Sequence, residues 1–409
     1  MRIGIFTNNY LPNPYGVTQS VESFRKQFEK LGPASNASPA RQPDGSYGGG
    51  RSDAGRHEVF IFAPKWKGYA DENPHVFRYP SISTNIKFKF PLAIPYSRKM
   101  DKIIEKLDLD IIHSQHPNLL GTAAAKWARK KKIPLVFTWH TLYDKYAHFV
   151  VIIPEKLAAW WTIRNAKNYA NQADYIIAPT QSVKEIIKNW GVTNKNIKAI
   201  SSGVEEEIYQ KADKRIIRNK FAVKDGEILL LLVSRLTSEK NIEFLFRAVI
   251  KVLKKNENAK FLVAGDGDLV PGLKLMAREN NLEDRIFFAG IVDKAEIKNY
   301  YAAGDIFVYA SKSETQGMII TEAMYLGLPI VAVNAPGICD LVEDNINGFL
   351  VSGQEEEFAN AVNKLISDAD LRKKFSEASA KIARENYTDK ICAEKLLHVY
   401  EKAIASYSK

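Results

Sequence analysis

The chain has 409 residues, of which 45% are hydrophobic, and its formal net charge is +11. This length is sufficient for two domains, each with its own core. Its two cysteines, Cys339 and Cys392, form no Cys-x-x-Cys pair, which excludes a disulfide framework and fits a reducing compartment. The N-terminus is predicted to form a first strand rather than a signal peptide, and no apolar run approaches the roughly 18 residues that span a bilayer.

The positive charge is concentrated in the first half of the chain. Residues 1–200 contain 29 Lys and Arg against 15 Asp and Glu, a balance of +14. Residues 201–409 contain 29 against 32, a balance of −3. A basic surface of this size attracts anionic polymers or an anionic membrane, although a generic solubility surface would show the same excess.

Short apolar segments alternate with helical stretches along the whole chain, which predicts parallel sheets wrapped by helices. In the first half the expected strands are residues 2–7, 59–63, 111–113, 135–139 and 175–178. In the second half they are residues 229–234, 260–264, 286–288, 306–309 and 330–333. Two successive sets of this kind predict two doubly wound α/β domains, with the boundary in the turn-rich segment near residue 203.

Residues 33–56 fit neither set of strands and helices. The segment contains Ala-Ser-Asn-Ala-Ser-Pro, Pro-Asp-Gly and three consecutive glycines, and almost no apolar residue. We therefore expect a flexible insertion in a surface loop, which costs little entropy.

Two segments of the first half follow expected strands and carry candidate ligand contacts. In Tyr-Gly-Val-Thr, Gly16 allows the backbone to approach a ligand closely, and the helix that follows offers free amides. In Phe-Thr-Trp-His-Thr, His140 lies just past an apolar strand, where a lone histidine is also common as a structural side chain. His113 and His116 lack a convincing third ligand, so no zinc site is predicted.

In the second half, Arg235 and Lys240 follow a strand of consecutive apolar residues. Folds of this type bind ligands at the carboxyl edge of the sheet, where two cations could bind an anionic ligand. On the residues alone, a pair of solvated loop side chains is the favoured interpretation. Asp266 and Asp268 resemble a metal-binding pair but are better explained by a tight turn.

Glu314 and Glu322 lie eight residues apart in a strand-loop-helix frame. The helix is expected to begin at about Gly317, so that the amides of Gly317, Met318 and Ile319 point to a possible phosphate site. Glu314 would lie in the loop beside that site, and Glu322 about one and a half turns into the helix. The bare spacing has no diagnostic value, because two glutamates of an ordinary charged helix repeat it.

The stretch from residue 311 to 332, with Ser-Lys-Ser-Glu-Thr-Gln-Gly and the two glutamates, resembles the Glu-x7-Glu signature of retaining GT-B glycosyltransferases of family 4. It is most similar to the diacylglycerol glucosyltransferase branch. The resemblance implies two facing Rossmann-like domains, residues 1–203 for the acceptor and 204–389 for the nucleotide sugar. It also implies that a last helix within 390–409 crosses back to the first domain.

The resemblance further implies roles for the candidate residues. Arg235 and Lys240 would bind the diphosphate, Glu322 the ribose, and Glu314 and His140 the reacting sugar. The Thr-x-His-Thr element carries the match for His140, whereas the loop at Gly16 has one glycine where many members of the family have two. The implied reaction needs neither a cofactor nor a metal.

By resemblance, the donor is UDP-glucose and the acceptor a membrane lipid such as diacylglycerol, and the enzyme is cytoplasmic and peripheral on the inner face of the membrane. The basic and aromatic residues between 85 and 99 and the pair Trp160 and Trp161 fit an anionic bilayer surface, or alternatively a core.

One alternative is a transferase of the same fold that uses GDP-mannose, or acts on phosphatidylinositol, a polyprenyl lipid or a soluble sugar. A more distant alternative is a nucleic-acid-binding protein, although no such motif is present. The oligomeric state is not predicted.

Overall fold

The structure, a computed structural model, describes residues 1–13, 16–31, 57–83, 91–142 and 155–407. The insertion expected at 33–56 lies outside the described residues, as does part of the basic and aromatic stretch between 85 and 99. The chain forms two compact units. Unit 1 comprises Met1–Pro179, Lys184–Ser202 and Cys392–Lys409, and unit 2 comprises Thr180–Val183 and Gly203–Ile391.

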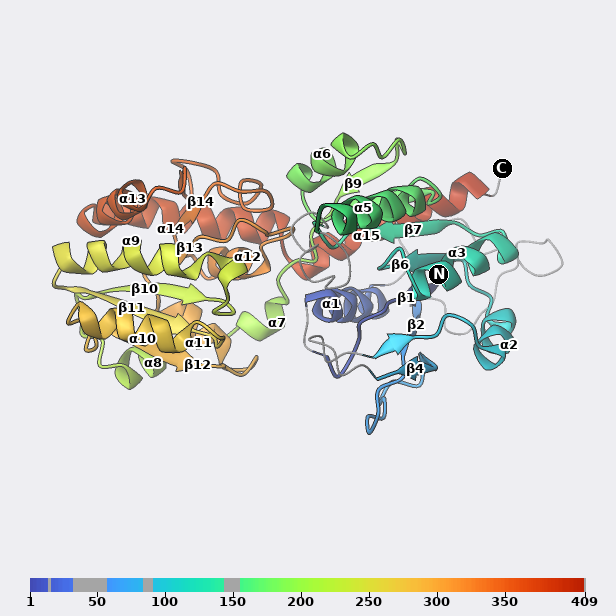
Figure 1. Cartoon of the computed structure of the whole chain (residues 1–409), viewed down its shortest axis with the longest axis horizontal. Helices are drawn as coiled ribbons and strands as arrows, with labels where there is room; N and C mark the ends of the chain where they lie inside the picture. The colour runs from blue at the N-terminus through green and yellow to red at the C-terminus, as the bar shows by residue number, and fades with distance from the viewer. Residues whose placement is uncertain (14–15, 32–56, 84–90, 143–154, 408–409) are drawn as a thin grey trace. The chain divides into compact units, whose positions relative to one another are not determined.

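Unit 1 is built on a parallel seven-stranded sheet in the order β3-β2-β1-β6-β7-β8-β9 (Figure 1). Its strands are β1 (Arg2–Phe6), β2 (Glu58–Pro64), β3 (Val76–Tyr79), β6 (Ile111–Ser114), β7 (Leu135–Thr138), β8 (Tyr175–Ala178) and β9 (Ile197–Ala199). A separate antiparallel pair consists of β4 (Ser81–Ile82) and β5 (Leu92–Ala93).

The helices assigned wholly or mainly to unit 1 are α1 (Gly16–Lys30), α2 (Arg98–Lys106), α3 (Leu120–Lys131), α5 (Glu155–Ala170), α6 (Gln181–Asn189) and α15 (Asp389–Tyr407). The last of them, α15, packs its apolar side into the core of this unit. Leu396 and Tyr400 of this helix join the same buried cluster as Ile3 of β1 and Phe28 of α1.

Unit 2 contains a parallel six-stranded sheet in the order β12-β11-β10-β13-β14-β15 (Figure 1). Its strands are β10 (Ile228–Val233), β11 (Ala259–Ala264), β12 (Ile286–Gly290), β13 (Ile306–Tyr309), β14 (Ile330–Val333) and β15 (Gly348–Val351). Central strands such as β10 and β13 are almost wholly apolar, as expected where helices bury both faces of a parallel sheet.

The helices of unit 2 are α7 (Glu206–Tyr209), α8 (Lys214–Lys220), the 3₁₀ turn η2 (Ser238–Lys240), α9 (Ile242–Lys255), α10 (Val270–Glu279), α11 (Ile297–Ala303), α12 (Met318–Tyr325), α13 (Glu355–Ser367) and α14 (Ala369–Asn386). Side chains cap two of them locally. Asp213 accepts a hydrogen bond from the amide of Arg215 at the start of α8, and Asp368 accepts one from the amide of Leu371 at the start of α14. The two sheets confirm the predicted α/β class with two Rossmann-like domains.

Candidate active site

The candidate residues of unit 2 gather at the carboxyl edge of its sheet. In the strand order, β10 and β13 are neighbours, although the chain goes from β10 to β11 and β12 before it returns to β13. This reversal is a topological switch point, where doubly wound folds form ligand sites. Arg235 follows β10, and Glu314 follows β13.

The loop that carries Arg235 is held by two glycines of the neighbouring loop. A Cβ atom at Gly265 would lie 1.8 Å from the carbonyl oxygen of Ser234, and one at Gly267 would lie 2.2 Å from that of Leu236. No side chain fits at either position, so the two loops pack backbone against backbone. The start of the Arg235 loop is thereby fixed in place.

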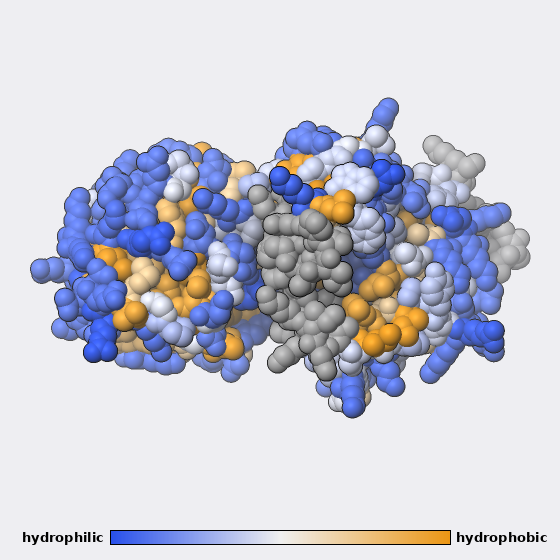
Figure 2. Space-filling view, viewed as in Figure 1, coloured by the Kyte–Doolittle hydropathy of each residue, from blue (hydrophilic) through white to orange (hydrophobic). Residues whose placement is uncertain are grey.

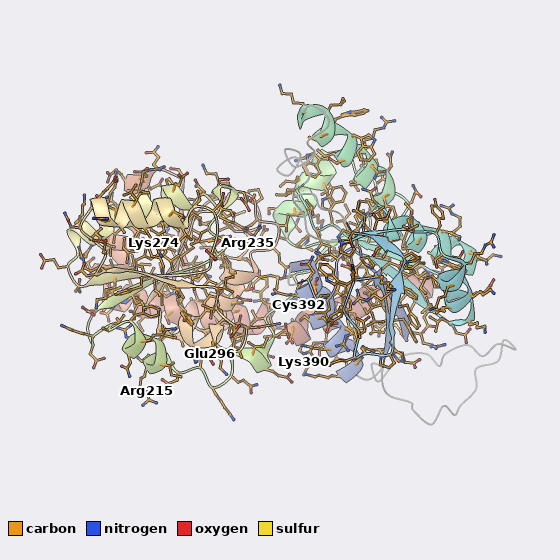
Figure 3. All side chains as sticks on the ribbon, turned by 60° about the horizontal axis from the view of Figure 1, so that its bottom comes forward. Arg215, Arg235, Lys274, Glu296, Lys390 and Cys392 are labelled. Atoms are coloured by element: carbon orange, nitrogen blue, oxygen red, sulfur yellow. The ribbon has the colours of Figure 1, made fainter. Side chains whose placement is uncertain are left out.

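The two candidate cations have different surroundings. Arg235 is exposed at the surface of unit 2 (Figure 3) and lies 3.2 Å from Glu239, an ion pair that solvent weakens. Lys240 is largely buried, and its ammonium group pairs with Oε1 of Glu314. The structure therefore joins two predicted site residues, Lys240 and Glu314, that are 74 positions apart in the sequence.

Glu314 also accepts a hydrogen bond from the hydroxyl of Tyr309, at 2.5 Å from Oε1. Burial alone would raise the pKa of Glu314, but the charge of Lys240 and hydrogen bonds from Lys240, Tyr309 and Ser311 outweigh it. The pKa of Glu314 therefore lies below its usual value, and the side chain is an anion at neutral pH.

Helix α12 begins directly after Gly317, close to the start expected from the sequence. Gly317 has a φ of 65°, a left-handed conformation that favours glycine. The amides of Ile320 and Thr321 donate to the carbonyl oxygen of Gly317 and begin the helical hydrogen bonds. The amides of Gly317, Met318 and Ile319 precede these bonds, at the positive end of the helix dipole.

Glu322 lies in α12 and is held by a different set of residues from Glu314. The hydroxyl of Tyr301 donates to its Oε2 at 2.7 Å. Burial raises the pKa of Glu322 above its usual value, although hydrogen bonds from Tyr301 and Tyr209 act in the opposite direction. The two glutamates of the motif thus have pKa shifts of opposite sign.

In unit 1, His140 follows β7, and its Nε2 lies 2.7 Å from Oε1 of Gln115. Its ring centroid is 6.3 Å from that of His116. Burial, helped by the neighbouring His116 and His113, lowers the pKa of His140 to about 3. The imidazole is therefore neutral at physiological pH and can exchange hydrogen bonds with a hydroxyl group.

The other two histidines of this edge are also neutral and hydrogen-bonded. His113 lies between Tyr400, 2.5 Å from its Nδ1, and Thr138, 2.6 Å from its Nε2. Nδ1 of His116 accepts from the amide of Asn8 at 3.1 Å. Burial lowers the pKa values of His113 and His116 to about 3 and 4. Within the described ranges, no group of three or more His, Cys, Asp or Glu side chains could hold a metal ion.

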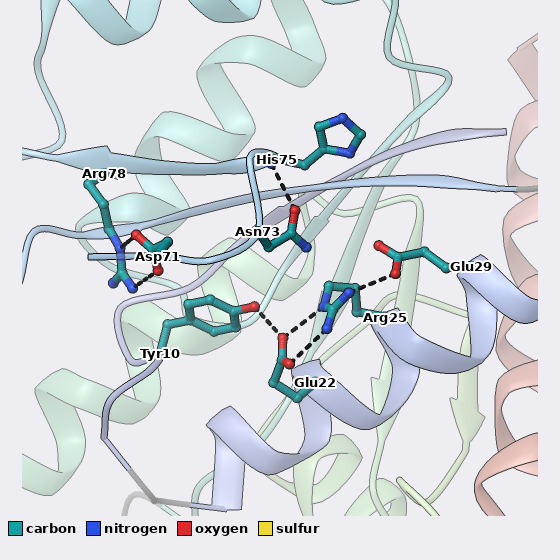
Figure 4. Close-up of polar contacts among 8 residues, drawn as sticks. All are labelled: Tyr10, Glu22, Arg25, Glu29, Asp71, Asn73, His75 and Arg78. Atoms are coloured by element: carbon teal, nitrogen blue, oxygen red, sulfur yellow. Dashed lines mark hydrogen bonds and ion pairs between the residues drawn. The ribbon is translucent and has the colours of Figure 1, made fainter. Parts of the chain in front are cut away.

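Gly16 is the first residue of α1, and a Cβ atom there would meet no described atom within 4 Å. Polar contacts fix the chain just before it (Figure 4). The guanidinium of Arg78 donates to the carbonyl oxygen of Leu11 at 2.8 Å and lies 5.4 Å from the ring centroid of Tyr10. The hydroxyl of Tyr10 in turn donates to Glu22 of α1.

Sequence reasoning did not identify the residues that hold the predicted side chains. Tyr309 and Tyr301 bind the two glutamates, and Gln115 binds His140. A weak signal existed for Tyr309, because a phenol at the end of a buried strand needs a polar partner. The turn expected at Asp266 is present, with the amide of Gly267 donating to Oδ1 of Asp266 at 2.8 Å.

Comparison with known proteins identifies the family. The family model described as Glycosyl transferases group 1 matches residues 213–382, and the one described as Glycosyltransferase Family 4 matches residues 52–208. An alpha-monoglucosyldiacylglycerol synthase of Streptococcus pneumoniae is 30% identical over 402 residues, which cover 96% of this chain and 84% of that protein. The chain is a GT-B glycosyltransferase.

Two further proteins support this assignment. An alpha-monoglucosyldiacylglycerol synthase of Acholeplasma laidlawii is 29% identical to this glycosyltransferase, over 87% of this chain and 86% of that protein. The crystal structure of HepE from Anabaena in complex with UDP has the same fold, with a TM-score of 0.75 at 20% identity, and covers 98% of this chain and 100% of that one. The resemblance found in the motif around Glu314 and Glu322 is thereby confirmed.

A hexosyltransferase of this fold must stabilise the charge that develops on its leaving group. The carboxyl edge of unit 2 brings two cations and the first amides of α12 to neighbouring loops, which suits an anionic leaving group. The edge of unit 1 carries neutral imidazoles, which suit uncharged hydroxyl groups. His140 and Gly16 belong to unit 1, and the other candidate site residues belong to unit 2.

Proposed function

We propose that this glycosyltransferase moves glucose from UDP-glucose to the free hydroxyl of a diacylglycerol, with retention of the anomeric configuration. The observation that carries the donor assignment is the buried pair of Lys240 and Glu314 beside the start of α12. The alpha-monoglucosyldiacylglycerol synthases found by comparison support the acceptor.

In this proposal the donor lies along the edge of unit 2. Lys240 and Arg235 neutralise the diphosphate, together with the amides of Gly317, Met318 and Ile319. Each cation acts on charge that grows as the bond to the sugar breaks, so its effect is largest in the transition state.

Two carboxylates fix the ends of the donor. Glu322 accepts hydrogen bonds from the ribose hydroxyls, and Glu314 accepts them from the hydroxyls of the sugar. Because the Glu314 carboxylate is ionised and held in place, it is an oriented hydrogen-bond acceptor for the sugar hydroxyls. Neutral His140 contacts the same sugar from unit 1.

The acceptor hydroxyl enters on the face that the leaving group vacates. A phosphate oxygen of the departing diphosphate takes the proton of the acceptor hydroxyl while the new glycosidic bond forms. The protein side chains orient the reactants and stabilise charge, and no side chain forms a covalent bond to the sugar. This order of events retains the configuration at the anomeric carbon.

A lipid acceptor requires contact with a membrane, which we assign to unit 1. Leu157, Trp160 and Trp161 of α5 are exposed, the two tryptophans at 55% each. The guanidinium of Arg164, one turn further, lies 5.4 Å from the ring centroid of Trp160. Aromatic rings beside basic groups are suited to the interface of an anionic bilayer.

A second exposed apolar group adjoins the pair of β4 and β5. It comprises Ile82, Leu92, Ile94 and Tyr96, the last of which is 75% exposed. Figure 2 shows apolar surface on unit 1 around β4 and next to α5. Together with the +14 balance of residues 1–200, these groups support peripheral docking on the inner, cytoplasmic face of the membrane. Among the residues described, no helix combines the length and apolar character needed to cross a bilayer.

The reaction is tested with a panel of radiolabelled nucleotide sugars and a total lipid extract. We expect label from UDP-glucose in a lipid that comigrates with glucosyldiacylglycerol, with an α linkage by NMR. Transfer from GDP-mannose, or to a phosphatidylinositol, polyprenyl or water-soluble acceptor, would contradict the donor or acceptor assignment while leaving the enzyme class intact. For changes at Glu314 and Glu322, the matched control is Glu377→Gln. Glu377 is an exposed glutamate of α14 and begins a pair with the same spacing as Glu314 and Glu322.

Membrane docking is tested by pelleting with vesicles. Binding to phosphatidylglycerol vesicles should exceed binding to neutral vesicles and should weaken at 1 M salt, where the Debye length falls to about 3 Å. Salt should not abolish binding, because aromatic insertion resists salt. The double variant Trp160→Ala and Trp161→Ala should bind both kinds of vesicle more weakly, because insertion of the aromatic rings does not require lipid charge. Equal pelleting with neutral and anionic vesicles, or none with either, would contradict this docking, and salt-sensitive binding to oligonucleotides alone would favour a nucleic-acid partner.

A further inference from the structure

The hydroxyl group of Tyr309 and the ammonium group of Lys240 donate to the same oxygen, Oε1 of Glu314. Tyr309 is the last residue of β13 and is fully buried. Lys240 belongs to η2, so the two donors reach Glu314 from separate elements of unit 2. Together with Ser311, they hold the carboxylate in place.

The ring of Tyr309 and its hydroxyl group do different things. The ring fills the core beside Phe307, with ring centroids 6.2 Å apart, and a phenylalanine would fill the same space. Burial, the nearby charge of Glu314 and the hydrogen bond to it all raise the pKa of Tyr309, so the phenol stays protonated and donates. The hydroxyl therefore adds a hydrogen bond to Glu314 that a phenylalanine would lack.

We propose that Tyr309 is a positioning residue of the transfer reaction, which holds the Glu314 carboxylate in place next to Lys240. This inference rests on the proposed function, in which Lys240 contacts the diphosphate and Glu314 the sugar. Without Tyr309, the carboxylate would keep Lys240 and Ser311 as donors and would follow the ammonium group more readily when the diphosphate attracts it. With the buried Tyr309 as a fixed donor, Glu314 keeps its orientation toward the sugar.

The geometry predicts which kinetic constant responds. Tyr309 does not touch the substrates in this scheme, so its removal should have little effect on KM. A misplaced Glu314 would stabilise the transition state for cleavage of the bond to the sugar less well, so kcat should fall. A hydrogen bond to a charged group typically accounts for an effect of about 10-fold.

The test is a double-mutant cycle of Tyr309→Phe and Glu314→Gln, read in kcat and KM for UDP-glucose. Alone, Tyr309→Phe should lower kcat about 10-fold with nearly unchanged KM. In the Glu314→Gln background, the same change should lower kcat less than about 2-fold, because Tyr309 acts through Glu314. Equal losses in the two backgrounds would show that Tyr309 does not act through Glu314 and would overturn the proposal.

Tyr301→Phe is the matched control. Tyr301 is also fully buried, and its hydroxyl binds the other glutamate, Glu322. Its effect on kcat/KM should be the same with and without Glu314→Gln. An effect that shrinks as much as that of Tyr309→Phe would show that the cycle reports general damage to unit 2.

A second readout separates this proposal from the proposed function. The free energy of unfolding is also measured by denaturant for the four proteins of the Tyr309 cycle. The losses of unfolding free energy in the two single variants should not add up in the double variant, whatever the substrate is. Additive unfolding effects would mean that the hydrogen bond to Glu314 is not made, and would overturn the proposal. A wild-type protein that uses no nucleotide sugar would contradict the proposed function, whereas additive losses of kcat in an active enzyme contradict only the role of Tyr309.

Discussion

The carboxyl edges of the two sheets have the same architecture but different electrostatics, with an ion pair in unit 2 and neutral imidazoles in unit 1. In unit 2, the edge carries Lys240 paired with an ionised Glu314. In unit 1, the edge carries His113, His116 and His140, whose pKa values are lowered to about 3, 4 and 3. Burial acts on both sets of groups, but among the described residues a counter-ion that keeps the charge is found only at the edge of unit 2.

This difference fits the division of labour that we propose for the two units. A charged edge stabilises an anionic leaving group, and a neutral edge binds hydroxyl groups without competing for phosphate. The parallel sheet supplies the place for a ligand in both units, and the residues that follow each strand supply the chemistry.

The largest expected effect comes from removing the charge of the unit 2 edge. Lys240→Ala should lower kcat/KM for the donor by more than 100-fold, which corresponds to about 3 kcal/mol. It should also reduce stability, because Glu314 would be left buried without its partner. Steady-state kinetics and thermal melting check both effects, with Lys312→Ala, an exposed lysine of the loop after β13, as control.

A Lys240→Ala variant that keeps near-normal turnover would remove the basis for assigning the diphosphate to unit 2. Arg235→Ala provides a second test, because Arg235 is exposed and is not needed to neutralise a buried carboxylate. Its loss should therefore lower activity without the loss of stability expected for Lys240→Ala.

The neutral histidines predict how stability depends on pH. Their pKa values are near 6.5 in the unfolded chain and much lower in the folded one, so the unfolded chain binds more protons between these values. Stability should thus be complete above pH 6.5 and should fall as the pH drops toward 3–4. For His140 alone the loss between pH 6.5 and 5 is about 2 kcal/mol.

The pH effect is measured by denaturant unfolding at pH 7 and pH 5. His140→Gln should lose less stability between the two pH values than the wild type, because one titrating group is gone. Identical pH dependence in wild type and His140→Gln would show that His140 is not held neutral by burial.

The two glutamates Glu314 and Glu322 of unit 2 should affect different kinetic constants. Glu314→Gln should lower kcat about 10-fold, because Glu314 faces the reacting sugar, whereas Glu322→Gln should raise KM for the donor by a similar factor with kcat preserved. A ribose contact is much the same in ground and transition states, which is why KM responds. Kinetics in which Glu322→Gln lowers kcat and Glu314→Gln changes only KM would reverse the assignment.

The smallest effect is expected for residues 33–56, which carry few apolar residues and fit neither predicted set of strands and helices. Deletion of this segment should leave kcat/KM and the melting temperature almost unchanged, because loop length has a weak effect on stability. A deleted protein that is insoluble or inactive would show that the segment packs against, or acts on, unit 1.

The sequence predicted the central strands well and missed strands at the sheet edges. β10 and β13 are buried on both faces and consist of consecutive apolar residues. β3, β9 and β15 lie at the edges of their sheets and were not predicted, whereas the edge strand β12 was. The three missed strands have four residues or fewer, and β3 and β9 also mix apolar and charged residues.

The candidate site could be predicted only in part for a similar reason. Gly317 could be foreseen at the start of α12 because strand, loop and helix adjoin in the sequence. The pairing of Lys240 with Glu314, and the hydrogen bond from Tyr309, depend on how separate elements pack. The pKa shifts of the histidines depend on burial in the folded unit, which no local pattern displays.

The central claim is that the charged edge of unit 2 binds the donor diphosphate. A crystal structure of the protein with UDP tests this most directly. We expect phosphate oxygens within hydrogen-bond distance of Lys240 and Arg235 and of the amides at the start of α12, with the ribose hydroxyls on Glu322. A diphosphate bound elsewhere, with the ion pair of Lys240 and Glu314 unchanged, would contradict the donor site in unit 2.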